Sequence, residues 1–288
     1  MTTTPDSYCV MGNPVAHSRS PWIHARFAEL TGQNLQYERA LAPLDGFTDF
    51  VRNFAAKGGK GCNVTVPFKL EAAELACSAS ERVRLAGAAN TLVFGSDGIY
   101  ADNTDGLGLV ADITRNAGVT IAGRDVMLLG AGGAAAGALG TLLEQAPRRV
   151  AVVNRTHAKA QALVVQHAAI AALHKVELQA LERQSLEADL TQNFDIVINA
   201  TASSLNGADV PAPASVLHAR TLAYDMMYGP SAQNFLDWAS SHGALARDGL
   251  GMLVEQAAES FALWRGVRPP AAQVLAELRT LLQTEATR

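Results

Sequence analysis

The chain has 288 residues, of which 49% are hydrophobic and 17% are charged, with a formal net charge of −4. This length indicates two domains and this composition is globular. The negative net charge and the lack of a basic cluster argue against nucleic acid or an anionic membrane as the main partner. No apolar run approaches the ~18 residues of a membrane span, and the opening MTTTPDSY has no secretory pattern.

The cysteines point to a reducing compartment. Cys9, Cys62 and Cys77 form no CxxC pair and no even set. We therefore expect reduced thiols that fill the core of a cytoplasmic protein, and no metal site.

The first part of the chain mixes strands and helices. Its patterns predict strands at 8–12, 61–68, 91–94 and 99–102, the last two forming a hairpin. They predict helices at 21–32, 69–77 and 105–118. Gly32 follows the end of the first helix, and Asp105 is the expected N-cap of the third.

From residue 125 onward, strands and helices alternate. Strands are predicted at 125–130, 149–155, 194–201 and 221–228, with helices after Gly130 and from His157. Such alternation is typical of a doubly wound parallel sheet. Two amphipathic helices follow, at 251–266 and 271–283.

The predicted fold class is therefore α/β with two domains. We expect an N-terminal α/β substrate domain over 1–105 and a Rossmann nucleotide domain over 106–244. The helices within 245–288 are expected to return to the first domain.

A glycine-rich turn follows the predicted strand at 125–130. The stretch 130–135, GAGGAA, fits G-x-G-x-x-G/A and leads from an apolar strand into an alanine-rich helix, which is the context that this motif requires. Glycines let backbone N–H groups approach a pyrophosphate, and the helix N-terminus adds partial positive charge. The turn therefore predicts a dinucleotide site.

The next predicted strand favours NADP over NAD. An NAD site usually places a carboxylate about 20 residues after the glycine motif. Here the strand ends in Asn154, Arg155 and Thr156, followed by Lys159. Arg155 can stack on adenine and pair with a 2′-phosphate, which a carboxylate would repel.

The stretch 61–69, GCNVTVPFK, places a lysine after a strand. In an extended strand Asn63 and Thr65 face one way, whereas Val64 and Val66 face the core. Pro67 suits the first turn of a helix, which would put Lys69 near the positive end of the helix dipole. A cation is disfavoured there, so Lys69 should release its proton more easily and could act as a general acid or base.

Other polar residues gather in predicted loops. Ser18 and Ser20 follow the first strand and suit a substrate carboxylate, although Ser20 before Pro21 also suits an ordinary helix cap. Asn90 and Asn103 each fit a turn as readily as a ligand site. His17 and His24 are expected to be structural.

Together these stretches resemble the shikimate dehydrogenase family in its biosynthetic, NADP-dependent form. The motifs that carry the resemblance are GNPVAHSRSPWIH, GGKGCNVTVPFK, LAGAANT, DNTDGLG, GAGGAA, NRT, INAT, YDMMY and DGLGMLVEQAAESFALWRG, in that order. The resemblance covers nearly the whole chain. It implies reversible reduction of 3-dehydroshikimate to shikimate by NADPH, in aromatic amino-acid biosynthesis.

The resemblance also implies roles for single residues. Lys69 would be the catalytic lysine and Asp105 its acidic partner. The substrate would contact Ser18, Ser20, Thr65, Asn90, Asp105, Tyr228 and Gln256. NADP would contact Glu81, Gly130, Ala131, Gly132, Gly133, Ala134, Asn154, Arg155, Thr156, His157, Ala158, Lys159, Met226 and Gly249. We expect a small-molecule substrate, neither nucleic acid nor membrane as partner, and allow for a homodimer.

The chain departs from the family pattern in three places. Ala101 replaces a glycine before NTDG, the strand-end NAT continues as ASSLNG, and GPSAQNFL follows Tyr228. These differences concern loop geometry and leave the expected reaction unchanged.

Three other functions stay open at this point. A quinate/shikimate dehydrogenase with relaxed cofactor use would be expected to have an acidic residue near Arg155, and the sequence has none there. A folate dehydrogenase/cyclohydrolase also joins a lysine-bearing domain to a Rossmann domain, but it does not match NTDG or GNPVAHSRS. A non-catalytic NADP-binding module would be expected to have lost Lys69 or Asp105, and both are present.

Overall fold

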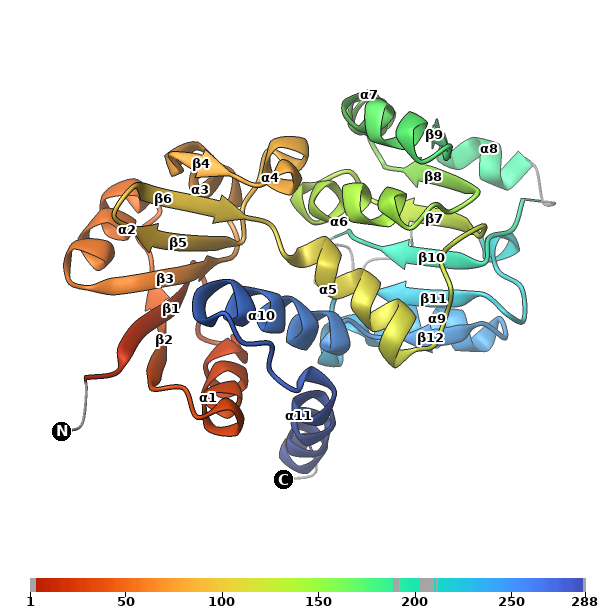
Figure 1. Cartoon of the computed structure of the whole chain (residues 1–288). Helices are drawn as coiled ribbons and strands as arrows, with labels where there is room; N and C mark the ends of the chain where they lie inside the picture. Colours follow the sequence, from red (N-terminus) through yellow and green to blue (C-terminus); the bar gives the residue numbers. More distant parts are fainter. Residues whose placement is uncertain (1–3, 189–191, 202–209, 211, 287–288) are drawn as a thin grey trace. The chain divides into compact units, whose positions relative to one another are not determined.

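The computed structural model describes residues 4–188, 192–201, 210 and 212–286. The chain forms two compact units, Met1–Gly108 with Leu253–Arg288 and Leu109–Met252, here called the first and the second unit. Figure 1 labels the helices and strands of both. The predicted α/β class is confirmed, because each unit is built on its own six-stranded sheet.

The sheet of the first unit is mixed. Its strand order is β2-β1-β3-β5-β6-β4. β1 pairs in parallel with β2 and β3, whereas β3, β5 and β6 pair antiparallel in turn. The strands are β1 Asp6–Gly12, β2 Leu35–Leu41, β3 Gly59–Val64, β4 Ser78–Ala79, β5 Thr91–Gly95 and β6 Gly98–Asp102.

Helices surround this sheet. They are α1 Ser20–Thr31, α2 Phe47–Ala56, α3 Lys69–Leu75, α4 Glu81–Ala86, α5 Asp105–Ala111, α10 Leu250–Arg265 and α11 Ala271–Ala286. The buried core includes the stacked rings of Phe47 and Phe68, with centroids 4.5 Å apart. α11 lies beside α1, where Arg26 bonds both carboxylate oxygens of Glu277 at 2.6 and 2.9 Å.

The second unit has a fully parallel sheet. Its order is β12-β11-β10-β7-β8-β9, which is the doubly wound order with the switch point between β7 and β10. The strands are β7 Asp125–Leu129, β8 Arg149–Val153, β9 Glu177–Leu181, β10 Ile196–Asn199, β11 Leu222–Asp225 and β12 Leu245–Arg247. Its helices are α6 Gly133–Glu144, α7 His157–Leu173, α8 Arg183–Ala188 and α9 Gln233–Ser241. All five residues of β7 are buried, as a central strand covered on both faces requires.

Several elements differ from the sequence prediction. The strand expected at 61–68 ends at Val64, and Val66 is 61% exposed rather than in the core. Pro67 precedes α3 instead of lying in it, since α3 begins at Lys69. α5 continues at Asp112 into a π-helical turn that ends at Asn116.

Gly32 is confirmed as the C-cap of α1, with a φ of 64°, but the two predicted N-caps were wrong. Asp105 is the first residue of α5, and its backbone N–H donates to Asn103 Oδ1 at 3.1 Å. Asn103 therefore caps the helix and leaves the Asp105 carboxylate for other partners. Likewise Ser20 lies inside α1, and its N–H donates to Ser18 Oγ at 3.3 Å.

Two other expectations concern single segments. Cys9 and Cys62 are buried, but Cys77 is exposed and so does not fill the core. Residues 245–252, expected with the returning helices, belong to the second unit because Leu245–Arg247 pairs with β11.

None of the helices in the described part of the chain combines the length and the apolar character that a membrane span requires.

The three departures from the family pattern have different outcomes. Ala101 lies in β6, is fully buried and pairs with Leu92 of β5, so it fits a regular strand. After Tyr228 the chain makes a 3-10 turn, Gly229–Ala232, before α9. The ASSLNG segment, 202–207, lies outside the described residues.

Candidate active site

In the first unit, the strand directions bring several loops to one edge of the sheet. β1 and β3 are parallel and end together, so Asn13 N–H donates to Val66 O at 3.0 Å just beyond them. β5 runs the opposite way and begins there, and β6 ends there, so Asn90 N–H donates to Asp102 O at 3.1 Å. The polar residues that the sequence spreads over about 90 positions therefore share one edge.

Lys69 and Asp105 form an ion pair at this edge. Lys69 Nζ lies 2.5 Å from Asp105 Oδ2, with side chains 22% and 10% exposed. α3 supplies the lysine from its first residue, and α5 supplies the aspartate from its first residue. The pair is mostly withdrawn from water, yet the lysine retains access to a small molecule.

Asn90 fixes the other oxygen of Asp105. Its Nδ2 donates to Asp105 Oδ1 at 2.8 Å, and its Oδ1 accepts from the backbone N–H of Thr104 at 2.8 Å. A backbone N–H can only donate, so it decides which way the Asn90 amide points. The carboxylate is thus held at both oxygens, by Asn90 and by Lys69.

Asn63 does not present its amide for a ligand, contrary to the expectation from 61–69. It is 6% exposed, and its Oδ1 accepts from the Tyr37 hydroxyl at 2.7 Å. Its Nδ2 donates to Asn90 O, Thr91 Oγ1 and Ser260 Oγ at 3.1, 3.1 and 2.9 Å. Asn63 lies below the edge, where it ties β2, β3, β5 and α10 together.

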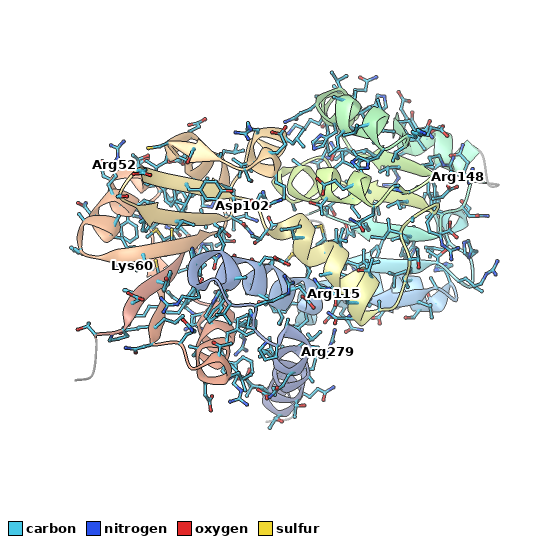
Figure 2. All side chains as sticks on the ribbon, viewed as in Figure 1. Arg52, Lys60, Asp102, Arg115, Arg148 and Arg279 are labelled. Atoms are coloured by element: carbon cyan, nitrogen blue, oxygen red, sulfur yellow. The ribbon has the colours of Figure 1, made fainter. Side chains whose placement is uncertain are left out.

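A second buried carboxylate supports the turn before α5. Asp102, labelled in Figure 2, is 4% exposed and accepts from Ser80 Oγ at 2.6 Å and from Arg82 Nη2 at 2.8 Å. It also accepts from the backbone N–H of Asn103 at 2.7 Å. These bonds fix the turn that delivers Asp105.

Of the remaining substrate candidates of the first unit, Ser18 and Thr65 lie in loops and Gln256 lies on α10. Gln256 is 8% exposed and its Oε1 accepts from Asn90 Nδ2 at 3.3 Å. Ser18 and Thr65 are half-buried. Among the described residues the Thr65 hydroxyl has no hydrogen-bond partner, so it can serve a ligand. Arg39 donates twice to Ser18 O, at 3.0 and 2.6 Å, and steadies the serine loop.

The glycine turn of the second unit has room for a phosphate group. Gly130 has φ +110°, and a Cβ there would lie 3.1 Å from the Ala200 backbone, so only glycine fits easily. Among the residues that the structure describes, a Cβ at Gly132 or Gly133 would meet nothing within 4 Å. Within the same residues no side chain caps the α6 N-terminus, and the first turn of α6 has no acidic residue. This open, uncapped helix start suits a pyrophosphate.

The end of β8 carries positive charge. Asn154 Nδ2 donates to Thr156 O at 2.9 Å, which shapes the turn into α7. Arg155 and Lys159 are exposed, and neither side chain has a partner within the described ranges. Such unpaired cations suit the 2′-phosphate of NADP. Ala158 is exposed beside them and His157 is half-buried.

A third segment lies beyond the ends of β10 and β11. A Cβ on Gly249 would lie 2.3 Å from Met226 O, so glycine is required for this close approach. Asn199 Nδ2 donates to Asp225 Oδ2 at 3.0 Å, and Met227 N–H donates to Asp225 Oδ1 at 2.8 Å. Both polar side chains are buried and hold the backbone around Met226.

Two predicted site residues, one for the substrate and one for the cofactor, have surroundings that give less support to these roles. Tyr228 is half-buried in the second unit, immediately before the 3-10 turn. Glu81 belongs to the first unit, is 71% exposed and pairs with Arg84 at 2.9 Å. Its contact with a cofactor stays a prediction.

Sequence reasoning missed the residues that support the site from below. Ser260, Thr104, Asp102, Asn199 and Asp225 all contact predicted site residues or their backbone neighbours. All five lie inside quoted motifs: DNTDGLG, INAT, YDMMY and DGLGMLVEQAAESFALWRG. Ser260 follows Gln256 by one helical turn, which places both on one face of α10.

The described residues show no group of three or more His, Cys, Asp or Glu side chains that could hold a metal ion.

Three family models match successive parts of the chain. Residues 10–92 match the family model of the shikimate dehydrogenase substrate binding domain, and residues 112–223 match shikimate / quinate 5-dehydrogenase. Residues 249–279 match the shikimate 5'-dehydrogenase C-terminal domain.

Individual relatives extend the match to the full length. Shikimate dehydrogenase (NADP(+)) of Acidovorax sp. (strain JS42) is 71% identical over 99% of this chain and 100% of its own length. An Ael1 enzyme from Pseudomonas putida has a TM-score of 0.87 at 46% identity, covering 95% of this chain and 98% of that one. Shikimate 5-dehydrogenase from Thermus thermophilus, solved with NADP(H) and shikimate, has a TM-score of 0.82 at 28% identity, covering 96% and 99%.

Proposed function

The chain belongs to the shikimate dehydrogenase family, and we propose that it catalyses the reversible NADPH-dependent reduction of 3-dehydroshikimate to shikimate. This is the reaction of the aromatic biosynthetic route to which that family belongs. The 71% identity to an NADP-dependent relative supports the choice of cofactor.

The residues of the second unit fit NADP. The open glycine turn and the uncapped start of α6 would hold the pyrophosphate. Arg155 and Lys159 would hold the 2′-phosphate, and no carboxylate stands at the end of β8 to repel it. Met226 and Gly249 would line the nicotinamide end. When bound, NADPH supplies the hydride that reaches the ketone carbon of the substrate.

The first unit would bind the substrate and handle its proton. Ser18, Ser20 and Thr65 offer hydroxyls to the substrate carboxylate and ring hydroxyls. Asn90, Asp105 and Gln256 would contact the ring hydroxyls, and the substrate contact of Tyr228 stays a prediction from the family resemblance.

Lys69 would act as the general acid. Reduction of the ketone puts negative charge on its oxygen, and that oxygen needs a proton. Lys69 Nζ would donate this proton, and in the reverse direction would take it back from the shikimate hydroxyl. Asp105, 2.5 Å from Nζ, would hold the lysine in place and accept a bond from a neighbouring ring hydroxyl.

The observation that carries this proposal is the Lys69–Asp105 pair, held by Asn90 and only partly open to water. The test is to incubate the purified protein with 3-dehydroshikimate and NADPH and to follow the loss of NADPH absorbance. Shikimate should appear in equal amount by NMR. NADPH binding without any turnover would favour the non-catalytic module instead.

The proposal extends to compartment and assembly. The reduced cysteines Cys9 and Cys62 suit the cytoplasm. Large exposed apolar side chains in the first unit, Leu41, Leu44 and Val66 among them, suit a homodimer that covers them. Light scattering at micromolar concentration should give twice the monomer mass, and a monomer mass would refute the dimer.

A further inference from the structure

A buried layer of hydrogen bonds lies beneath the Lys69–Asp105 pair. Its members are Tyr37 on β2, Asn63 on β3, Thr91 on β5 and Ser260 on α10, none of them more than 8% exposed. None carries a role in the reaction proposed above.

The orientation of each amide in this layer is fixed by backbone groups. Asn63 Nδ2 lies 3.1 Å from Asn90 O, and a carbonyl oxygen can only accept, so the nitrogen must face it. Asn63 Oδ1 then faces the Tyr37 hydroxyl, which must donate, at 2.7 Å. The amide of Asn90 is oriented in the same way. Its Oδ1 accepts from the backbone N–H of Thr104, so its Nδ2 faces Asp105.

The Tyr37 hydroxyl keeps its proton. Burial raises the pKa of Tyr37 well above its usual value, and its ring stacks on His24 with centroids 4.1 Å apart. Burial also lowers the pKa of His24 to about 3, so the stacked imidazole is neutral. Tyr37 therefore donates to Asn63 Oδ1, and its ring is held by the stacked imidazole of His24.

On these contacts we propose that Tyr37 and Asn63 are positioning residues, which act through Asn90 to hold Asp105 and Lys69 in register. The chain of contacts runs from Tyr37 to Asn63, then to Asn90, Asp105 and Lys69, at 2.7, 3.1, 2.8 and 2.5 Å. This inference rests on the proposed function, because it assigns the two residues a part in that reaction.

A positioning role differs from a ligand role in its kinetics. Loss of a ligand contact would raise KM, whereas loss of alignment should lower kcat. A misplacement near 1 Å can cost about 10²-fold, so we expect Asn63→Ala to lower kcat by roughly 100-fold with little change in the KM for shikimate. Tyr37→Phe removes one neutral hydrogen bond and should lower kcat by about fivefold.

A matched control is available in the same aromatic cluster. Tyr8 is 3% exposed, packs against Trp264 with ring centroids 4.7 Å apart and has its hydroxyl 3.4 Å from Arg265 Nη1. Tyr8→Phe also deletes a buried phenol hydroxyl and should leave kcat unchanged. The double variant Tyr37→Phe/Asn63→Ala should be no slower than Asn63→Ala alone, since Tyr37 acts through Asn63.

The experiment combines these kinetics with structures of the wild type and of Asn63→Ala. Crystals of the variant should show the Asn90–Asp105 contact lengthened or lost. The proposal is overturned if KM rises while kcat holds, if Tyr37→Phe matches Tyr8→Phe, or if the contact is unchanged. If Asn63→Ala does not fold, the comparison of kcat between Tyr37→Phe and Tyr8→Phe tests the proposal. Should the wild type not turn over shikimate, the proposed function fails and the crystal structures alone decide the positioning.

Discussion

Replacement of Lys69 should remove proton transfer while leaving both binding functions in place. Lys69→Met keeps the length of the side chain and deletes its donor. Lys69 Nζ lies 2.5 Å from Asp105 Oδ2 and the lysine side chain is 22% exposed, so the change removes the ammonium donor from a mostly buried position. We expect kcat to fall by roughly 10²–10⁴-fold, the usual loss for a general acid or base.

The same change should have a modest effect on stability. Asp105 loses one charged partner but keeps Asn90 Nδ2 at 2.8 Å. A buried charged group that loses one hydrogen bond costs about 1–3 kcal/mol, so the variant should fold and its melting temperature should fall by a few degrees. Binding of NADPH should be unchanged, because the second unit holds the cofactor residues.

Steady-state rates with shikimate and NADP, together with NADPH fluorescence titration, measure both effects. Lys60→Ala is the matched control: this exposed lysine of β3 is labelled in Figure 2 and should be dispensable. Lys69→Arg separates charge from proton donation, since a guanidinium keeps the charge but does not release a proton. Near-normal turnover in Lys69→Met, or full recovery in Lys69→Arg, would refute the role of Lys69 as an acid.

Three further predictions concern other parts of the molecule. Arg155→Ala should raise KM for NADPH by roughly 10- to 100-fold, as for a lost charged hydrogen bond, and raise KM for NADH much less, since NADH loses only the stacking on adenine; equal effects on both would contradict the phosphate contact. Gly249→Ala should weaken NADP binding in titrations, because a Cβ would lie 2.3 Å from Met226 O; wild-type affinity would show that the close approach is relieved cheaply. His24→Gln should flatten the pH dependence of stability, because burial lowers the pKa of His24 from 6.5 to about 3. Between those values the unfolded chain binds one more proton, so the wild type should lose up to about 1.4 kcal/mol per pH unit on acidification; parallel slopes in urea unfolding at pH 6.5 and 5 would count against this.

The sequence predicted the parts of the fold with continuous apolar runs. β7 and β8 are buried along their lengths, and the glycine turn between β7 and α6 stands where the motif places it. The prediction omitted β2, β4, β9 and β12, which are the edge strands of the two sheets. β2 buries only Tyr37, and the charged pair Glu38 and Arg39 interrupts the alternation of apolar and polar residues that would identify a strand.

The site was predicted less completely than the fold. Lys69 at the start of a helix follows from Pro67 and from the end of the strand, and its pairing with Asp105 follows from the family resemblance. The inward turn of Asn63 could not be predicted, because it depends on Tyr37 and Ser260, far away in sequence. The role of Asn103 at the start of α5 could not be predicted either, because Asp and Asn are equally good caps. Only the ion pair of Asp105 with Lys69 decides which of the two residues caps the helix.

The decisive experiment measures initial rates with shikimate or quinate, each with NADP or NAD. We expect fast turnover only with shikimate and NADP, because Arg155 and Lys159 favour a cofactor with a 2′-phosphate. Comparable rates with quinate or with NAD would contradict it and would assign the enzyme a broader quinate/shikimate activity.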